Sequence, residues 1–178
     1  MDRTLIDSAA NALGIEAVFL RASAIRCRED FQPQFIEDHL SLVPQYRAGP
    51  TGRCHIFTSS HEATGETNKV AAFYFGVGVR LVDGESLAAT ETGEALPDDA
   101  AYLEIECEFC AQYRVAGAAD DHELQPALEE FGRYNVGYHV WPYWREYLQG
   151  SCARMGIPAI PLPTYQIPPS LTASDPPS

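Results

Sequence analysis

The chain has 178 residues and a mass of 19.6 kDa, which suits a single domain with a hydrophobic core of its own. Hydrophobic residues make up 46% of it, but its 25 acidic side chains outnumber the 12 basic ones. The resulting net charge of −13 repels phosphate backbones, so the composition argues against nucleic acid as a partner and favours basic partners.

The sequence also predicts where the protein works. No stretch reaches the roughly 18 apolar residues that a membrane span needs. The N-terminus has an acidic residue at Asp2, and its short apolar run is broken by Asp7 and Asn11, unlike a secretory signal. We therefore expect a cytoplasmic protein with five free thiols, since an odd number of cysteines argues against a disulfide framework.

The first half of the chain predicts a helix, a strand and a long connection. Apolar residues at helical spacing predict a short amphipathic helix over 3–13, and a run of β-forming residues predicts a strand over about 15–28. Several prolines and glycines make 29–52 an irregular connection, although it is rich in apolar side chains. These crossover residues are Phe31, Phe35, Leu40, Leu42, Val43 and Tyr46.

Three further strands are expected, over 53–60, 69–82 and 100–115, with an acidic, turn-rich connection over 83–100. Apolar side chains alternate at period two in the last two strands, so one face of each is buried. The pattern indicates three or four antiparallel strands, without the alternation of strands and helices that a parallel sheet requires. The opposite face of the last strand carries Glu104, Glu106 and Glu108.

From Glu123 to about Met155 the apolar period becomes helical, and apolar residues cover more than one side. Such a helix is buried on two sides, the second of them against another subunit. Pro142 lacks an amide proton, so it predicts a kink or a restart of the helix. Residues 168–178, rich in proline, are expected to be a disordered tail.

The stretch "WPYWREY" at 141–147, followed by "GIPAIPLPTYQI" from Gly156, resembles the hallmark helix and proline-containing loop of the SecB family of cytoplasmic export chaperones. The resemblance spans 15–167, which would form one SecB-like domain preceded by a helical extension over 1–14. It implies an α+β fold in which a four-stranded antiparallel sheet packs with a long helix.

The resemblance also implies a function. SecB-like proteins are homotetramers, dimers of dimers, that hold non-native polypeptides in surface grooves without ATP. Here the groove would be walled by the six crossover residues and by Ile157, Ile160, Leu162 and Tyr165. The helix residues that would make packing and subunit contacts are Trp141, Tyr143, Trp144, Arg145 and Glu146.

Two partners remain open alternatives. Export members of the family dock the SecA motor through acidic residues, but Ala22 and Arg26 stand at the first-strand positions and only Glu106 is retained. The row of Glu104, Glu106 and Glu108 is therefore either a partner-docking face or a solvated face balanced by basic neighbours. The N-terminal helix instead resembles SecB-like chaperones of toxin–antitoxin systems, which protect a labile antitoxin.

We predict no metal, cofactor or enzymatic activity. Cys107 and Cys110 lie three apart on a strand, so they point to opposite faces, and no second Cys-x-x-Cys pair completes a zinc site. The five histidines lack metal-type spacing, and no phosphate-binding loop or nucleophile elbow is present.

Overall fold

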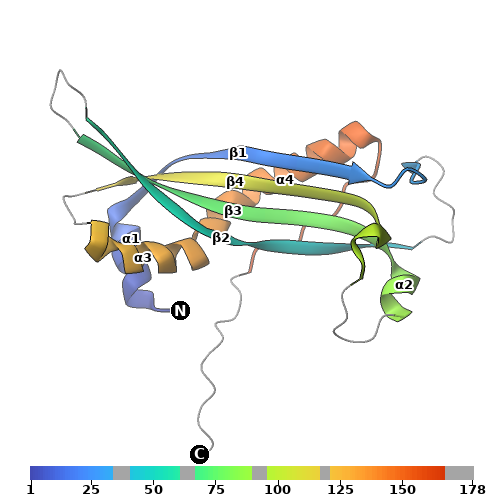
Figure 1. The fold of residues 1–178 in the computed structure, drawn as a ribbon, viewed down its shortest axis with the longest axis horizontal. Coiled ribbons are helices and arrows are strands. Elements are labelled where there is room, and N and C mark those ends of the chain that lie inside the picture. Colours follow the sequence, from blue (N-terminus) through green and yellow to red (C-terminus); the bar gives the residue numbers. More distant parts are fainter. Residues whose placement is uncertain (34–40, 61–66, 90–95, 117–120, 167–178) are drawn as a thin grey trace, which may run out of the picture.

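The protein folds as a four-stranded antiparallel sheet with helices on one face, as a computed structural model shows (Figure 1). The structure describes residues 1–33, 41–60, 67–89, 96–116 and 121–166. Its elements are α1 (Arg3–Ala12), β1 (Leu13–Cys27), β2 (Leu42–Ser60), β3 (Thr67–Asp83), α2 (Gly84–Ala89), a 3-10 turn (Asp98–Ala100), β4 (Ala101–Val115), α3 (Asp121–Tyr134) and α4 (Val136–Met155). The predicted α+β fold, with its antiparallel sheet, long helix and short N-terminal helix, is confirmed.

The strand order is β1-β4-β3-β2, so β3 and β4 are central and the other two strands form the edges. The period-two alternation in β3 and β4 has the predicted consequence, because one side chain in two faces the helices and is buried. Phe75, Val77, Ile105 and Phe109 are among these buried residues. The opposite face, which we call the outer face, carries Glu104, Glu106 and Glu108.

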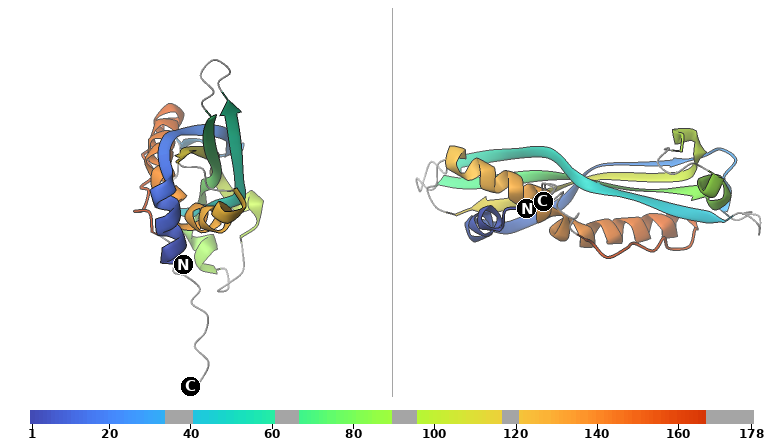
Figure 2. Two further views of the ribbon diagram at one scale, coloured as in Figure 1. Left: turned by 90° about the vertical axis from the view of Figure 1, so that its left-hand side faces the viewer. Right: turned by 90° about the horizontal axis from the view of Figure 1, so that it is seen from below.

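Helices α3 and α4 follow one another along the long axis of the molecule (Figure 2). Val140, Trp144, Leu148 and Cys152 recur every four residues along α4 and are fully buried against the sheet. The far side of α4 is open, with Tyr138 49% and Tyr143 47% exposed. In the described residues, no helix is long and apolar enough to cross a membrane.

Helix α1 packs against α3 and closes one end of the core. The Asp2 carboxylate caps α1 by accepting from the amide of Thr4 at 2.9 Å, and the Asp2 amide donates to Glu130 of α3. Ala9, on the inner side of α1, has no exposed surface. The small alanine lets the two helices approach closely.

The expectation that 29–52 is an irregular connection is wrong for its second half, because β2 begins at Leu42. Pro44 and Pro50 argue against a central strand, because proline has no amide proton to donate to a neighbouring strand. They are tolerated in β2 because it is an edge strand, which pairs with a neighbour on one side only. A bulge between Pro50 and Cys54 accommodates Gly52, whose φ is 77°. The segment predicted as a loop therefore contributes half of a strand.

The helical region restarts at Asn135 and not at Pro142, where the sequence predicted a kink or a restart. The break lies at Asn135, between α3 and α4, and Pro142 lies inside α4. Proline removes the hydrogen bond to the carbonyl of Tyr138, but both residues are exposed, so water can satisfy that carbonyl. The connection over 83–100 likewise holds one short helix, α2, that was not expected.

Buried Tyr113 of β4 and half-buried His139 of α4 form a polar pair between the sheet and the helix. Tyr113 is 1% exposed, and its hydroxyl is 2.7 Å from Nδ1 of His139. The ring of Phe131 in α3 packs edge-on against Tyr113. Burial lowers the pKa of His139 below its ordinary value and raises the pKa of Tyr113. Neutral His139 can accept the hydroxyl proton of Tyr113, whereas protonated His139 cannot.

We expect this pair to make stability depend on pH. Because the folded pKa of His139 lies below its ordinary 6.5, its contribution is complete above pH 6.5 and is lost as pH falls through the folded pKa. His139→Asn retains an acceptor oxygen but does not titrate. Its free energy of unfolding, measured with urea at fixed protein concentration, should fall less than that of wild type from about pH 7 to about pH 5. Parallel pH profiles for the two proteins would contradict this assignment.

Candidate functional site

The candidate site is built around residues 157–165, which we call the proline segment. Gly156 ends α4 in the left-handed conformation, with φ of 70°, and reverses the chain. The segment then runs back along α4, since Pro163 contacts Trp141 and Tyr165 reaches Gly137. Nine extended residues span about 28 Å at 3.1 Å each, and the 18 helical residues beside them span about 27 Å. The extended segment therefore matches the length of the helix that it follows.

Apolar anchors and hydrogen bonds hold the proline segment in place. Ile157 and Ile160 are buried in the core, at 8% and 6% exposure. The indole N–H of Trp141 donates to the carbonyl oxygen of Pro163 at 2.9 Å. The hydroxyl of Tyr46, on β2, donates to the carbonyl oxygen of Pro161. At the start of the segment the amide of Ile157 donates to the carbonyl oxygen of Cys152 at 3.1 Å, and beyond it the two proline carbonyls accept the side-chain hydrogen bonds.

Tyr165 ends the segment in an aromatic slot. Its ring centroid lies 4.9 Å from that of Tyr138, 5.1 Å from Trp141 and 6.3 Å from Phe75. A Cβ atom on Gly137 would lie 2.0 Å from the Tyr165 hydroxyl oxygen, a distance that no packing tolerates. Gly137 therefore opens the slot, and burial raises the pKa of Tyr165 so that its hydroxyl stays protonated.

The structure brings only some of the crossover residues to this site. Leu42 and Tyr46 lie on the helix side of β2 and pack against the core, next to the proline segment. Val43 alternates to the other side of the strand, where its side chain lies near Gly84. Phe31 is buried against Tyr102, with ring centroids 5.9 Å apart. The predicted groove residues Phe35 and Leu40 lie outside the described residues.

The residues expected in helix packing and subunit contacts divide between the two sides of α4. Trp141 and Trp144 are buried, and Trp144 is fully enclosed. Tyr143, Arg145 and Glu146 are exposed. Within the described residues, neither Arg145 nor Glu146 forms an ion pair, so these charges are free to contact a second molecule.

Sequence reasoning missed Gly137, Tyr138 and Phe75 as parts of the aromatic slot. Only Gly137 left a signal in the sequence. A glycine inside a helix is unfavourable by about 1 kcal/mol relative to alanine, so it marks a place where another group approaches closely. Tyr138 and Phe75 read as ordinary members of a helix stripe and a strand face.

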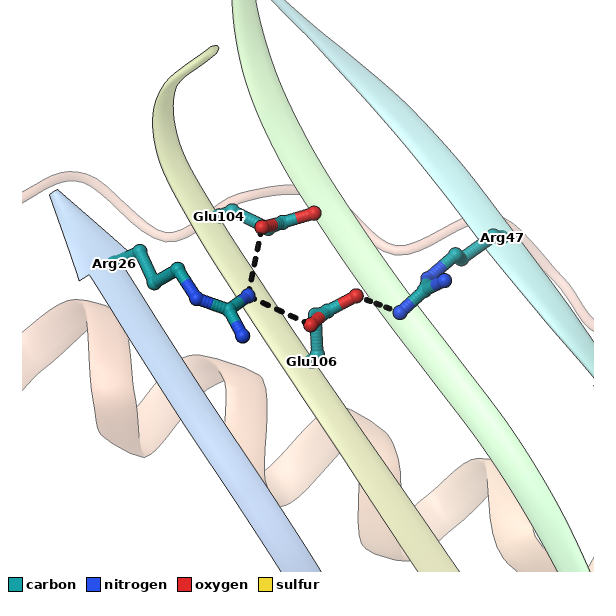
Figure 3. A network of polar contacts seen from close by, with 4 residues as sticks. All are labelled: Arg26, Arg47, Glu104 and Glu106. Atoms are coloured by element: carbon teal, nitrogen blue, oxygen red, sulfur yellow. Dashed lines mark hydrogen bonds and ion pairs between the residues drawn. The ribbon is translucent and has the colours of Figure 1, made fainter. Parts of the chain in front are cut away.

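On the outer face, every member of the predicted acidic row is paired with an arginine. Arg26 of β1 contacts Glu104 at 2.9 Å and Glu106 at 2.7 Å, while Arg47 of β2 reaches Glu106 from the opposite side (Figure 3). Arg53 of β2 pairs with Glu108 in the same way. The prediction of a face balanced by basic neighbours describes this arrangement.

The cysteines are separate from one another. Cys107 points toward the helices and Cys110 toward the outer face, as their spacing predicts. Burial raises the pKa of Cys107 to about 12, so its thiol stays protonated at neutral pH. All five cysteines are free thiols, and no group of three His, Cys, Asp or Glu side chains in the described ranges could hold a metal ion.

The fold of this chain matches a solved structure, that of the SecB-like chaperone Rv1957 of Mycobacterium tuberculosis in complex with a ChAD peptide from the HigA1 antitoxin. The match has a TM-score of 0.62 and covers 93% of this chain and 99% of that one, at 16% sequence identity. The fold of this chain is SecB-like. The prediction made from the "WPYWREY" stretch is confirmed at the level of the fold. No family model matches the sequence, and no curated protein matches it.

In this SecB-like fold, we expect Gly137 to control how the proline segment docks. Gly137→Ala places a methyl group on the Tyr165 hydroxyl and should displace the segment. A protease of broad specificity, such as proteinase K, should then cut within 157–166 at least tenfold faster than in the wild-type protein. Gly150→Ala is the matched control, because its methyl would meet only the flexible end of Arg154. Equal cleavage of the segment in the two variants would contradict the docking role of Gly137.

Proposed function

We propose that this protein is an ATP-independent holdase that binds unfolded or nascent polypeptides in an apolar groove beside the proline segment. The supporting observation is the partial exposure of apolar side chains along that segment. Leu42 and Tyr46 of β2, with Leu162 and Tyr165 of the segment, pack against the core on one side and remain half-exposed on the other. Such side chains are fixed in position yet keep apolar surface for a client.

The chemistry of the groove suits a binder of many sequences. Apolar area is non-directional, so a client needs no particular side chain to bury surface against it. Three prolines in the segment restrict its backbone, so less conformational entropy is lost when a client binds. A net charge of −13 adds attraction for clients rich in Lys and Arg, which salt weakens.

We further propose that the protein is a cytoplasmic homotetramer, built as a dimer of dimers. The edge strand β1 exposes Ile15, Leu20 and Ile25 on the helix side, next to unpaired backbone amides and carbonyls. Helix α4 exposes Tyr138 and Tyr143. These two apolar surfaces support two different subunit contacts, one at the sheet edge and one along the helix.

A second candidate function is to protect a labile antitoxin in a toxin–antitoxin system. The matched structure supports it, because that chaperone holds an antitoxin peptide. Docking to SecA during export has less support, since Ala22 and Arg26 replace the acidic first-strand residues and Glu106 is paired with two arginines. An adjacent toxin–antitoxin gene pair would favour the antitoxin role, and its absence would favour general or export clients.

The proposed assembly predicts the molar mass in solution. Light scattering at micromolar concentration should give about four times the mass of the 19.6 kDa chain. Tyr143→Ser removes an exposed apolar ring from α4 without changing the core, and it should shift the population toward dimers. A stable monomer for the wild-type protein would overturn the tetramer.

The proposed groove predicts which leucines bind clients. Leu42→Ala and Leu162→Ala should each weaken the binding of a permanently unfolded, fluorescently labelled client by about tenfold, because each removes apolar area worth about 1.5 kcal/mol. Phe57→Ala is the control, since Phe57 is an exposed aromatic residue on β2 outside the groove. Anisotropy titrations measure the affinities, and light scattering checks that the assembly is intact. Wild-type affinity in both leucine variants would place the groove elsewhere.

A further inference from the structure

The outer face of the sheet differs in charge from the rest of the chain. Its paired strands carry six arginines against four glutamates, in a chain that has 12 basic and 25 acidic residues. The arginines are Arg21, which lies at the β1 bulge near Cys110, and Arg26, Arg47, Arg53, Arg80 and Arg114, and the glutamates are Glu16, Glu104, Glu106 and Glu108. Within the described residues, α1, α3 and α4 pack on the other side of the sheet, so a local excess of positive charge is open to solvent on an otherwise acidic protein (Figure 2).

A glycine makes the central contact of this face possible. Gly78 of β3 lies between Arg47 of β2 and Glu106 of β4 in the register of the sheet. A Cβ atom at Gly78 would lie 2.8 Å from Nε of Arg47, so the arginine crosses β3 over bare backbone. Arg26 reaches the same carboxylate from β1, at 2.7 Å. Two guanidinium groups therefore share Glu106, and each keeps N–H donors that this carboxylate does not use (Figure 3).

Arg80 forms no ion pair within the described residues. Its Nε–H donates to the amide oxygen of Gln45 at 2.8 Å, and Glu104, which lies opposite Arg80 on β4, pairs with Arg26 instead. A hollow of about 400 Å³ opens beside it, and its charged lining residues are Arg47, Arg80, Glu104 and Glu106. A second hollow of about 310 Å³ lies on the other side of the Arg47–Glu106 pair, where small residues line it together with Glu108.

We propose that this outer face binds an acidic peptide segment of a partner protein, with one carboxylate seated on Arg80 and a second on the free donors of Arg47 and Arg26. Bidentate contact between guanidinium and carboxylate is short and strong, so a small excess of arginine can select for acidic groups at close range. The small residues that floor the two hollows leave room for an extended backbone. This surface is the outer side of the sheet, whereas the proposed client groove is on the helix side.

Other partners fit the face less well. A basic segment would find Glu104, Glu106 and Glu108 already paired. A nucleic acid carries a continuous row of phosphates, and most of them would lie outside direct contact with the arginines. The net charge of −13 on the chain would repel those phosphates. An acidic peptide with a few carboxylates meets the arginines and incurs less of that repulsion.

Fluorescence anisotropy of the full-length protein tests this proposal. The probes are a short peptide of alternating Glu and Ser, its Lys and Ser counterpart, and a single-stranded oligonucleotide, each at about 0.15 M ionic strength. Wild type should bind the acidic peptide at least tenfold more tightly than the other two. Arg80→Gln should weaken acidic-peptide binding by about tenfold. Arg154→Gln, in the exposed last turn of α4, should leave it unchanged.

A gain of affinity separates this role from damage to the fold. Glu106→Gln frees Arg47 and Arg26 from their shared carboxylate, and it should strengthen acidic-peptide binding by about threefold or more. The acidic peptide should not displace an unfolded client from the groove. Preference for the basic peptide or the oligonucleotide, wild-type affinity in Arg80→Gln, or weaker acidic-peptide binding in Glu106→Gln would each overturn the proposal. If client binding is lost while the acidic peptide still binds, the proposed client groove is wrong and the proposal for this face still holds.

Discussion

The packing of Tyr165 over the bare backbone of Gly137 fixes the position of the proline segment. Trp141 holds the same segment through its indole N–H, and the buried side chains of Ile157 and Ile160 attach its beginning to the core. Burying two isoleucine side chains contributes roughly 3–6 kcal/mol, a large fraction of the stability of a domain of this size. The segment that forms one wall of the proposed groove is thus also part of what holds α4 on the sheet.

The sheet separates two surfaces of different chemistry. Its helix side is apolar and carries the aromatic slot and the proline segment, while its outer side is a lattice of arginines and glutamates that cross from strand to strand. The outer lattice depends on Gly78, because a side chain there would block the path of Arg47 to Glu106. Surface ion pairs add little stability individually, so the effect of this lattice is on which partners the face accepts rather than on folding.

The sequence predicted the elements whose pattern is local. Strict alternation identified β3 and β4, and the spacing of apolar residues identified α1 and the inner stripe of α4. The start of β2 was missed because Pro44 and Pro50 break strands in general, and only the position of β2 at the sheet edge makes them tolerable. The break at Asn135 was missed because Pro142 was the stronger local signal.

The same holds for the candidate site: the parts that lie within one segment could be predicted from the sequence, and the contacts between distant segments could not. The resemblance indicated the proline segment and its facing residues, and the structure brings Tyr46 to Pro161 and Trp141 to Pro163. The slot for Tyr165 could not be foreseen, because it joins Phe75, Gly137 and Tyr138 from distant parts of the chain. The pairing of Arg47 with Glu106 was hidden for the same reason, since it skips a strand.

Hydrogen–deuterium exchange with and without a saturating unfolded client measures most directly whether polypeptides bind beside the proline segment. If they do, amides in 157–165 and in the first part of β2, at 42–47, should exchange at least tenfold more slowly when the client is bound. Amides of β4 beneath the outer face should exchange at the same rate in both samples. Unchanged exchange over 157–165 under saturating client, with slowing confined to other parts of the chain, would contradict the proposed groove.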